Sequence, residues 1–297
     1  MRHLLLAAAA SLALTAPVSA AQDRFANVEV KVEEVAPGVA VLFGAGGNIG
    51  VSYGEDGTIL VDDQFAGLTD KIVAAVGTLS DEEIRFVFNT HYHGDHTGGN
   101  ENLGNAGALI MAHDNVRARL VEALEDGDGE GGLPVITFSD GVTLHWNGDE
   151  IHVMHVHNAH TDGDSIIHWK KANVVHMGDT YFKDATWPYV DLAAGGSIDG
   201  VIATAKRVLD HSNSETVIIP GHGPVATQAD LKTYHDMLVA IRGGVKAAID
   251  EGHPLDHIQT MGLTDGYAVA TDGFISPTKF IEAVYKSLTG ATDYSPR

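Results

Sequence analysis

The chain has 297 residues, of which 44% are hydrophobic and 20% charged, an ordinary composition for a globular protein of one large domain or two small ones. Its formal net charge of −22 repels nucleic acid and so argues against functions that depend on binding a phosphate backbone. Cysteine is absent, so a disulfide or a thiolate ligand is excluded and any metal site must be built from His, Asp and Glu.

The first twenty residues have the pattern of a secretory signal peptide. A basic start at Met1-Arg2-His3 precedes a mostly apolar run from Leu4 to Val18, and small residues follow it. This run is too short to span a membrane comfortably, and no later stretch is long and apolar enough to do so. We therefore predict a signal peptide at residues 1–20 and a single domain over 21–297. The mature protein is expected to be periplasmic or secreted, without membrane association.

The first third of the chain predicts antiparallel strands followed by a helix and a buried strand. Residues 28–32 alternate with period two, and further strand patterns cover 39–43, 49–53 and 58–63. The last of these ends in two carboxylates, Asp62 and Asp63. The spacing of four apolar residues predicts one face of a helix that starts at Thr69 or Asp70: Leu68, Ile72, Val76 and Leu79. Residues 84–88 read as a buried strand.

The remaining elements alternate between strands and helices. Strands are expected at 108–111, 142–146, 151–156, 165–169, 173–175 and 215–219, and helices at 114–125, 199–211 and from Thr227 onward. Residues 125–132 are acidic and glycine-rich, which indicates a surface loop. A final helix has Ser276 as its N-cap, Pro277 at its first position and Gly290 beyond its end. No repeat or linker divides the chain.

Residues 89–100, with the sequence NTHYHGDHTGGN, contain the densest group of metal-ligating side chains. His91 and His93 are two residues apart, so in an extended segment both imidazoles point the same way. Asp95 and His96 follow directly and can reach a second point nearby. Neutral imidazole and carboxylate are the ligands that zinc takes. This segment therefore predicts a metal site.

Four predicted strands run straight into polar loops that carry His or Asp. The first ends at the segment just described, and the others lead to His160, Asp179 and His222. Open α/β sheets place ligands at the carboxyl ends of their strands. We therefore expect these four loops to form a single shared site.

The HxHxDH segment followed by Thr-Gly-Gly-Asn resembles the metal loop of the metallo-β-lactamase superfamily. The resemblance implies an α/β fold, namely a four-layer αβ/βα sandwich, and one or two metal ions, usually zinc. It also implies which residues bind them. His160, in AHTDGD, resembles the third histidine, which joins His91 and His93 around one metal. Asp179, in HMGDT, and His222, in PGHGP, resemble the ligands that complete the second site with Asp95 and His96.

Two positions depart from the zinc β-lactamases of the first class. Those enzymes have Cys where Asp179 stands and commonly Arg where His96 stands, whereas thioesterases and lactonases of the superfamily have Asp and His. The resemblance also implies a supporting role for Asp62 beneath the metal loop, and a role for Lys183 in binding a substrate carboxylate. His157 and Trp187 are further candidates for lining the pocket, against structural roles in the sheet and the core.

Three functions remain open. The first is a periplasmic dinuclear zinc hydrolase, with two Zn²⁺ per chain, in which a metal-bound hydroxide attacks the carbonyl of a β-lactam-like amide and Asp95 orients that hydroxide. The second is hydrolysis of a lactone or thioester by the same site. The third is a periplasmic metal-binding protein without catalysis. The expected partner is a small-molecule substrate and not nucleic acid. The oligomeric state, the substrate and the metal used in the cell are not predicted.

Overall fold

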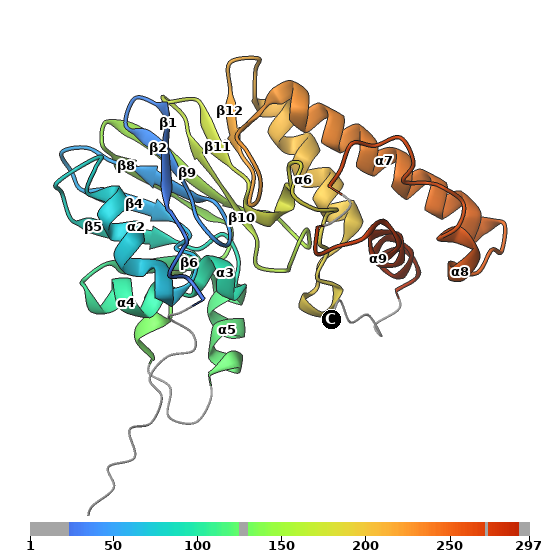
Figure 1. The fold of residues 1–297 in the computed structure, drawn as a ribbon, viewed down its shortest axis with the longest axis horizontal. Helices are drawn as coiled ribbons and strands as arrows, with labels where there is room; N and C mark the ends of the chain where they lie inside the picture. The colour runs from blue at the N-terminus through green and yellow to red at the C-terminus, as the bar shows by residue number, and fades with distance from the viewer. Residues whose placement is uncertain (1–23, 125–129, 271–272, 291–297) are drawn as a thin grey trace, which may run out of the picture.

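The computed structural model describes residues 24–124, 130–270 and 273–290, so the predicted signal peptide lies outside the described residues. Two β-sheets pack face to face, and helices cover the outer face of each (Figure 1). The first sheet has the strand order β1-β2-β3-β4-β5-β6-β7, and the second has the order β13-β12-β11-β10-β9-β8. Pairing is antiparallel at one end of the first sheet and parallel from β4 to β7, and in the second sheet only β11 and β12 pair in parallel.

The strands of the first sheet are β1 (Lys31–Ala36), β2 (Val39–Phe43), β3 (Ile49–Ser52), β4 (Thr58–Val61), β5 (Ile84–Phe88), β6 (Leu109–His113) and β7 (Ile136–Phe138). Those of the second are β8 (Gly141–Trp146), β9 (Asp149–His155), β10 (Ser165–Trp169), β11 (Val174–His176), β12 (Val217–Ile219) and β13 (Ala226–Thr227). The α-helices are α2 (Thr69–Val76), α3 (Gly94–Thr97), α4 (Asn100–Asn105), α5 (Asp114–Ala123), α6 (Ile198–His211), α7 (Gln228–Asp250), α8 (Leu255–Ile258) and α9 (Pro277–Thr289).

Side chains alternate between the two faces of each sheet, and this alternation divides the hydrophobic core into three layers. Between the sheets, Val61 and Phe88 from the first pack with Ile167 and Trp169 from the second. A second layer lies between the first sheet and α2, and a third lies between the second sheet and the helices α6, α7 and α9. The order helix, sheet, sheet, helix confirms the predicted αβ/βα sandwich.

Most predicted elements are present within one or two residues, and the differences have local causes. Strand β5 has the predicted bounds, and α9 begins after Ser276, whose side chain accepts from the backbone of Lys279. The first strand begins at Lys31 instead of residue 28, because its pairing with β2 begins at Lys31. The predicted helix over 114–125 ends at Ala123, and the loop prediction for 125–132 falls partly on residues outside the described ranges.

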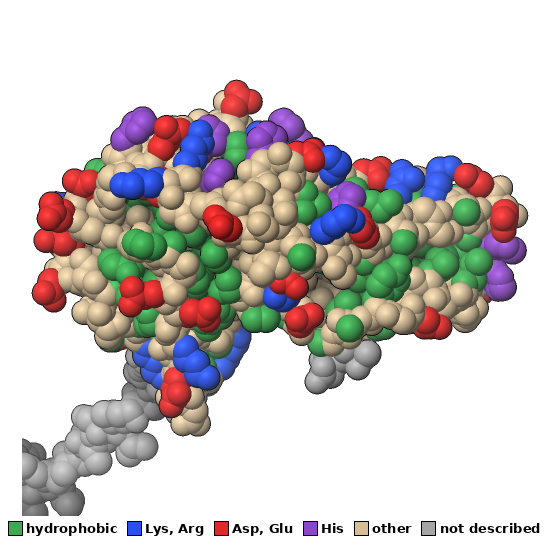
Figure 2. Space-filling model, turned by 90° about the horizontal axis from the view of Figure 1, so that it is seen from above, with side chains coloured by type: hydrophobic (Ala, Val, Ile, Leu, Met, Phe, Trp, Pro, Cys, Tyr) green, Lys and Arg blue, Asp and Glu red, His purple; other side chains and the backbone are tan. Residues whose placement is uncertain are grey.

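The surface agrees with the charge of the chain. Acidic side chains are spread over the face shown in Figure 2, lysine and arginine side chains are scattered among them, and most of the histidines lie along its upper edge. Within the described ranges, no helix is both long enough and apolar enough to cross a bilayer.

Candidate metal centre

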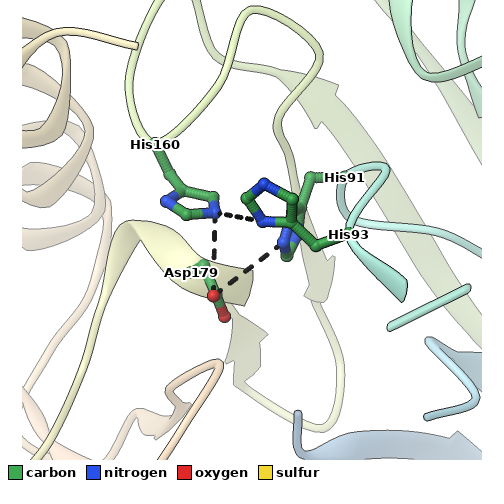
Figure 3. A group of neighbouring side chains, drawn as sticks. All are labelled: His91, His93, His160 and Asp179. Carbon is green, nitrogen blue, oxygen red and sulfur yellow. Dashed lines mark hydrogen bonds and ion pairs between the residues drawn. The ribbon is translucent and has the colours of Figure 1, made fainter. Parts of the chain in front are cut away.

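The polar loops after β5, β9, β11 and β12 meet at one edge of the two sheets, as the sequence predicts. They bring together two groups of side chains, and within each group the ligand atoms lie within 4.8 Å of one another. The first group is His91, His93, His160 and Asp179, and the second is Asp95, His96 and His222. Figure 3 shows the four side chains of the first group pointing toward one another from three separate segments. All seven residues implied by the resemblance are thus adjacent in space.

The carboxylate of Asp179 lies between the two groups. Its Oδ2 atom is 3.8 Å from His91 Nε2 and 3.7 Å from His160 Nε2. Its Oδ1 atom is 3.1 Å from His96 Nε2 and 3.4 Å from His222 Nε2. One carboxylate oxygen therefore faces each group, which is the arrangement of a carboxylate that can bridge two metal ions.

The separations between ligand atoms in the second group match those around zinc. Ligands about 2.0–2.2 Å from a tetrahedral zinc ion lie about 3.3–3.6 Å from one another. In the second group, Asp95 Oδ2 is 3.6 Å from His96 Nε2 and 3.4 Å from His222 Nε2, and the two Nε2 atoms are 3.4 Å apart. The first group is spaced less evenly: His160 Nε2 is 2.9 Å from His93 Nδ1, closer than this range, and Asp179 Oδ2 lies slightly beyond it from His91 and His160. The buried Nε2 atom of His91 makes no hydrogen bond, which leaves its lone pair for a metal ion.

In several of the candidate ligand histidines, the ring nitrogen that points away from the site contacts a hydrogen-bond acceptor. This contact fixes which nitrogen faces the site. His96 Nδ1 is 2.8 Å from Asp62 Oδ2, and His160 Nδ1 is 2.7 Å from the carbonyl oxygen of Tyr189. Because both acceptors engage Nδ1, the other ring nitrogen, Nε2, faces the site in each residue and could bind a metal ion. Asp62 also accepts from the backbone and hydroxyl of Thr90 at 2.7 and 2.8 Å, and Thr90 Oγ1 is 3.0 Å from His91 Nδ1.

Asp191 supports the site from a position that sequence reasoning missed. His93 faces the first group through Nδ1, and its Nε2 is 3.0 Å from Asp191 Oδ2. The same oxygen accepts from the Tyr92 hydroxyl at 2.8 Å. Asp191 directly follows the apolar and aromatic residues 187–190, and its local sequence contains no metal-binding pattern. Its role is visible only when the chain is folded.

Comparison with known proteins agrees with this geometry. The sequence model of the metallo-beta-lactamase superfamily matches residues 43–222, which is more than half of the chain. The chain belongs to the metallo-beta-lactamase superfamily. Its fold is similar to a metallo-beta-lactamase from Pontibacter korlensis, with 17% identity and a TM-score of 0.61 over 71% of this chain and 99% of the other. The DIM-1 metallo-beta-lactamase (21% identity, TM-score 0.59, 71% and 98% covered) and TMB-1 (18%, 0.59, 71% and 97%) are also similar.

Two glycines allow the backbone of this superfamily member to approach the ligands closely. A Cβ atom at Gly221 would lie 2.1 Å from Asp179 Oδ1, and one at Gly47 would lie 2.1 Å from His96 Cε1. Asp62 itself has a φ angle of 66°, a left-handed conformation that Asp tolerates better than most residues. Backbone is thus packed tightly against His96 in the metal loop and against Asp179.

The pKa values of the histidines differ between the two groups. Burial holds the pKa of His160 at about 4 and that of His91 well below its usual value, so both imidazoles are neutral and ready to bind a cation. Burial also raises the pKa of Asp95, but the charge of His96 and a hydrogen bond from His222 outweigh it and bring that pKa to about 2. Burial lowers the pKa of His222, but the charge of Asp179 outweighs it, and the result is about 9. Protons on the second group therefore compete with a metal ion.

Three residues that were candidates for lining the pocket make contacts with other parts of the fold. The predicted role of Lys183 in binding a substrate carboxylate is corrected by its contacts. Its Nζ atom donates to the Val225 carbonyl at 2.9 Å and pairs with Asp230 at 3.0 Å. Trp187 is 2% exposed and stacks on Phe280 within the core, as the structural alternative predicted. The exposed ring of His157 packs edge-on against His155. Asp62, by contrast, takes the predicted supporting position.

The contact of Asp191 with His93 generates a prediction. Asp191→Asn keeps the size of the side chain but removes the charge that holds His93 Nε2–H, and partners of metal ligands contribute about 10–100-fold in metal affinity or activity. We expect a loss of that size in zinc affinity, measured by competition with a chelator. Asp199→Asn is the matched control, because Asp199 is an exposed carboxylate on α6 that pairs with Arg242 on α7. Equal zinc affinities for both variants would contradict the assigned role.

The position of Asp179 generates a second prediction. Asp179→Ala removes an oxygen from each group, so both zinc-binding steps should weaken, each by at least about tenfold given what even indirect partners contribute. Stepwise titration against a chelator measures the two affinities. Weakening of one step alone would show that Asp179 serves a single metal ion.

Proposed function

We propose that the protein is a periplasmic zinc-dependent hydrolase that binds two metal ions per chain and attacks a carbonyl carbon. The observation that carries this proposal is the pair of adjoining ligand groups that share Asp179, with separations in the second group suited to tetrahedral zinc. His91, His93, His160 and Asp179 would hold one metal, and Asp95, His96, Asp179 and His222 would hold the other.

Zinc in such a site polarises a carbonyl group and lowers the pKa of water to about 7, which supplies a nucleophile at neutral pH. The chain orients that water and keeps the ligands fixed. Asp95 has a pKa of about 2 and its side chain is 29% exposed, so it stays ionised and can accept a hydrogen bond from the attacking water. No protein nucleophile is required, because the carboxylates and imidazoles act by binding and orientation.

A β-lactam-like cyclic amide is the first candidate substrate, supported by membership of the superfamily. Lactone or thioester hydrolysis is the second, and the position of Lys183 favours it. The ammonium group that would hold a lactam carboxylate is paired with Asp230 instead. Both reactions use the same attack on a carbonyl, so only the turnover of each substrate class distinguishes them.

Export is supported by the sequence of residues 1–20. A zinc hydrolase acting on small molecules outside the cytoplasm requires no macromolecular partner, and the acidic surface disfavours nucleic acid. A mature N-terminus at Ala21 in protein recovered from the periplasm is the observation that tests this part of the proposal.

A substrate panel tests the proposed function. Zinc-loaded protein beginning at Ala21 should turn over at least one member of a panel of β-lactams, lactones and thioesters. His93→Ala and Asp95→Asn should each lower kcat/KM by at least about 100-fold, the upper end of what partners of metal ligands contribute. His253→Ala, which truncates a partly exposed histidine shortly after α7, is the control. Binding of two zinc ions without any turnover would favour the non-catalytic metal-binding protein.

An aromatic wall beside the first ligand group predicts a preference for apolar substrates. Tyr189 stacks on His93 with ring centroids 5.6 Å apart, and Phe274 packs edge-on against Tyr189 at 5.8 Å. Phe274 is 62% exposed, and it lies beyond the residues that the superfamily model matches. An apolar group next to the scissile carbonyl can therefore cover this ring.

Phe274→Ala should lower kcat/KM for substrates with a bulky apolar group by about 5–30-fold, the equivalent of about 1–2 kcal/mol of lost burial, and leave small substrates nearly unchanged. The ratio of the two kcat/KM values is the measurement. Val135→Ala, which truncates another exposed apolar side chain, is the control. An equal loss on both substrate types would contradict a role in specificity.

A further inference from the structure

A cavity of about 250 Å³ lies on the outer face of the second sheet, beside the C-terminal half of α6. None of its lining residues belongs to either ligand group. Its floor is apolar and is formed by Met154 on β9, Ile166 on β10, Val175 on β11 and Val208 on α6. Met154 and Ile166 are cross-strand partners, so their side chains share this face.

The rim of the cavity consists of five basic or imidazole side chains: His152, His168, Lys170, Arg207 and His211. His152 and His168 are direct cross-strand partners on β9 and β10, while Arg207 and His211 are one turn apart on α6. Neither Asp nor Glu lines the cavity, although the chain has 40 acidic residues against 18 Lys and Arg. A basic rim on so acidic a protein is therefore a local departure from its overall charge.

Arg207 differs from other arginines in its pairing. Arg119 and Arg242 each donate two hydrogen bonds to a single aspartate. Arg207 instead places its guanidinium 3.3 Å from Met154 Sδ, at the boundary between rim and floor. Within the described residues it forms no ion pair, so its charge is available to a ligand.

The charges around the two cross-strand histidines support an anionic ligand. Burial lowers the pKa of His168, and Lys170, His152 and His211 lower it further, against a smaller opposing effect of Asp149. Both imidazoles gain a proton more readily once an anion neutralises the surrounding positive charge.

The pKa of His152 is lowered for similar reasons. Burial has the largest effect, and Lys170 and Arg207 add to it, whereas Glu150 opposes them. Lys170 and Glu150 pair at 2.7 Å, but both side chains are nearly half exposed, so this pair is solvated and weak. Lys170 therefore remains able to turn toward a ligand at the rim.

We propose that this cavity binds a short aliphatic carboxylate, with the carboxylate at the basic rim and the alkyl chain on the apolar floor. A guanidinium fork and imidazole N–H groups are matched donors for a carboxylate. The cavity of about 250 Å³ has room for about eight groups the size of a water molecule at about 30 Å³ each, which is the number of non-hydrogen atoms in hexanoate.

Isothermal titration with hexanoate tests the proposal. Metal-free and zinc-loaded full-length mature protein should bind it with the same affinity, because the cavity contains no metal ligand. Acetate lacks the alkyl chain and hexan-1-ol lacks the charge, so each should bind at least about tenfold more weakly. Affinity for hexanoate should rise from pH 8 to pH 6 as the imidazoles take up protons.

Arg207→Gln should weaken hexanoate binding by about tenfold or more, as expected for the loss of a charged hydrogen bond, and should leave hydrolysis at the metal centre unchanged. Arg242→Gln removes a surface arginine from α7 and is the matched control. Equal binding of hexanoate by Arg207→Gln and the parent protein would overturn the proposal. So would binding that requires zinc, which would place the carboxylate at the metal centre, or an affinity that is independent of pH.

Discussion

The carboxylate of Asp179 is the contact on which the organisation of the site depends. It is 5% exposed, and four imidazole nitrogens from three separate loops lie within 3.1–3.8 Å of its two oxygens. A carboxylate buried at this depth is stable only when opposite charge compensates it. Imidazolium groups in the second ligand group supply that charge in the absence of a cation, and metal ions would supply it in their presence. The two ligand groups are therefore parts of one electrostatic unit.

The packing of the two sheets keeps this unit together, because its members come from both. His91 and His96 follow β5 in the first sheet, whereas Asp179 and His222 follow β11 and β12 in the second. Asn48 joins the two sides: its backbone amide donates to Gly221 at 2.7 Å, and its side chain donates to two carbonyl oxygens around His222. The apolar layer between the sheets thus determines the distance between ligands from the two sheets. A loss of packing in this layer would change that distance.

The sequence predicts the parts of the site that depend on strand ends and fails where only tertiary packing decides. All seven candidate ligands lie together because they end or follow strands of one sandwich, and the apolar runs that form those strands are visible in the sequence. The positions of Lys183 and Trp187 could not be predicted, since the direction of a loop side chain depends on partners such as Asp230 and Phe280 that are distant in sequence. Asp191 was missed for the same reason.

The choice of Asp at position 179 has a consequence that a thiolate would not have. A carboxylate has two oxygens about 2.2 Å apart, so one can face each ligand group, whereas a thiolate offers a single sulfur atom. In this chain the two oxygens do face different groups, at 3.7–3.8 Å from the histidines of the first and 3.1–3.4 Å from those of the second. One side chain thus contacts histidines of both groups, and two buried carboxylates, Asp62 and Asp191, hold the imidazoles of His96 and His93 in the orientation that makes these contacts.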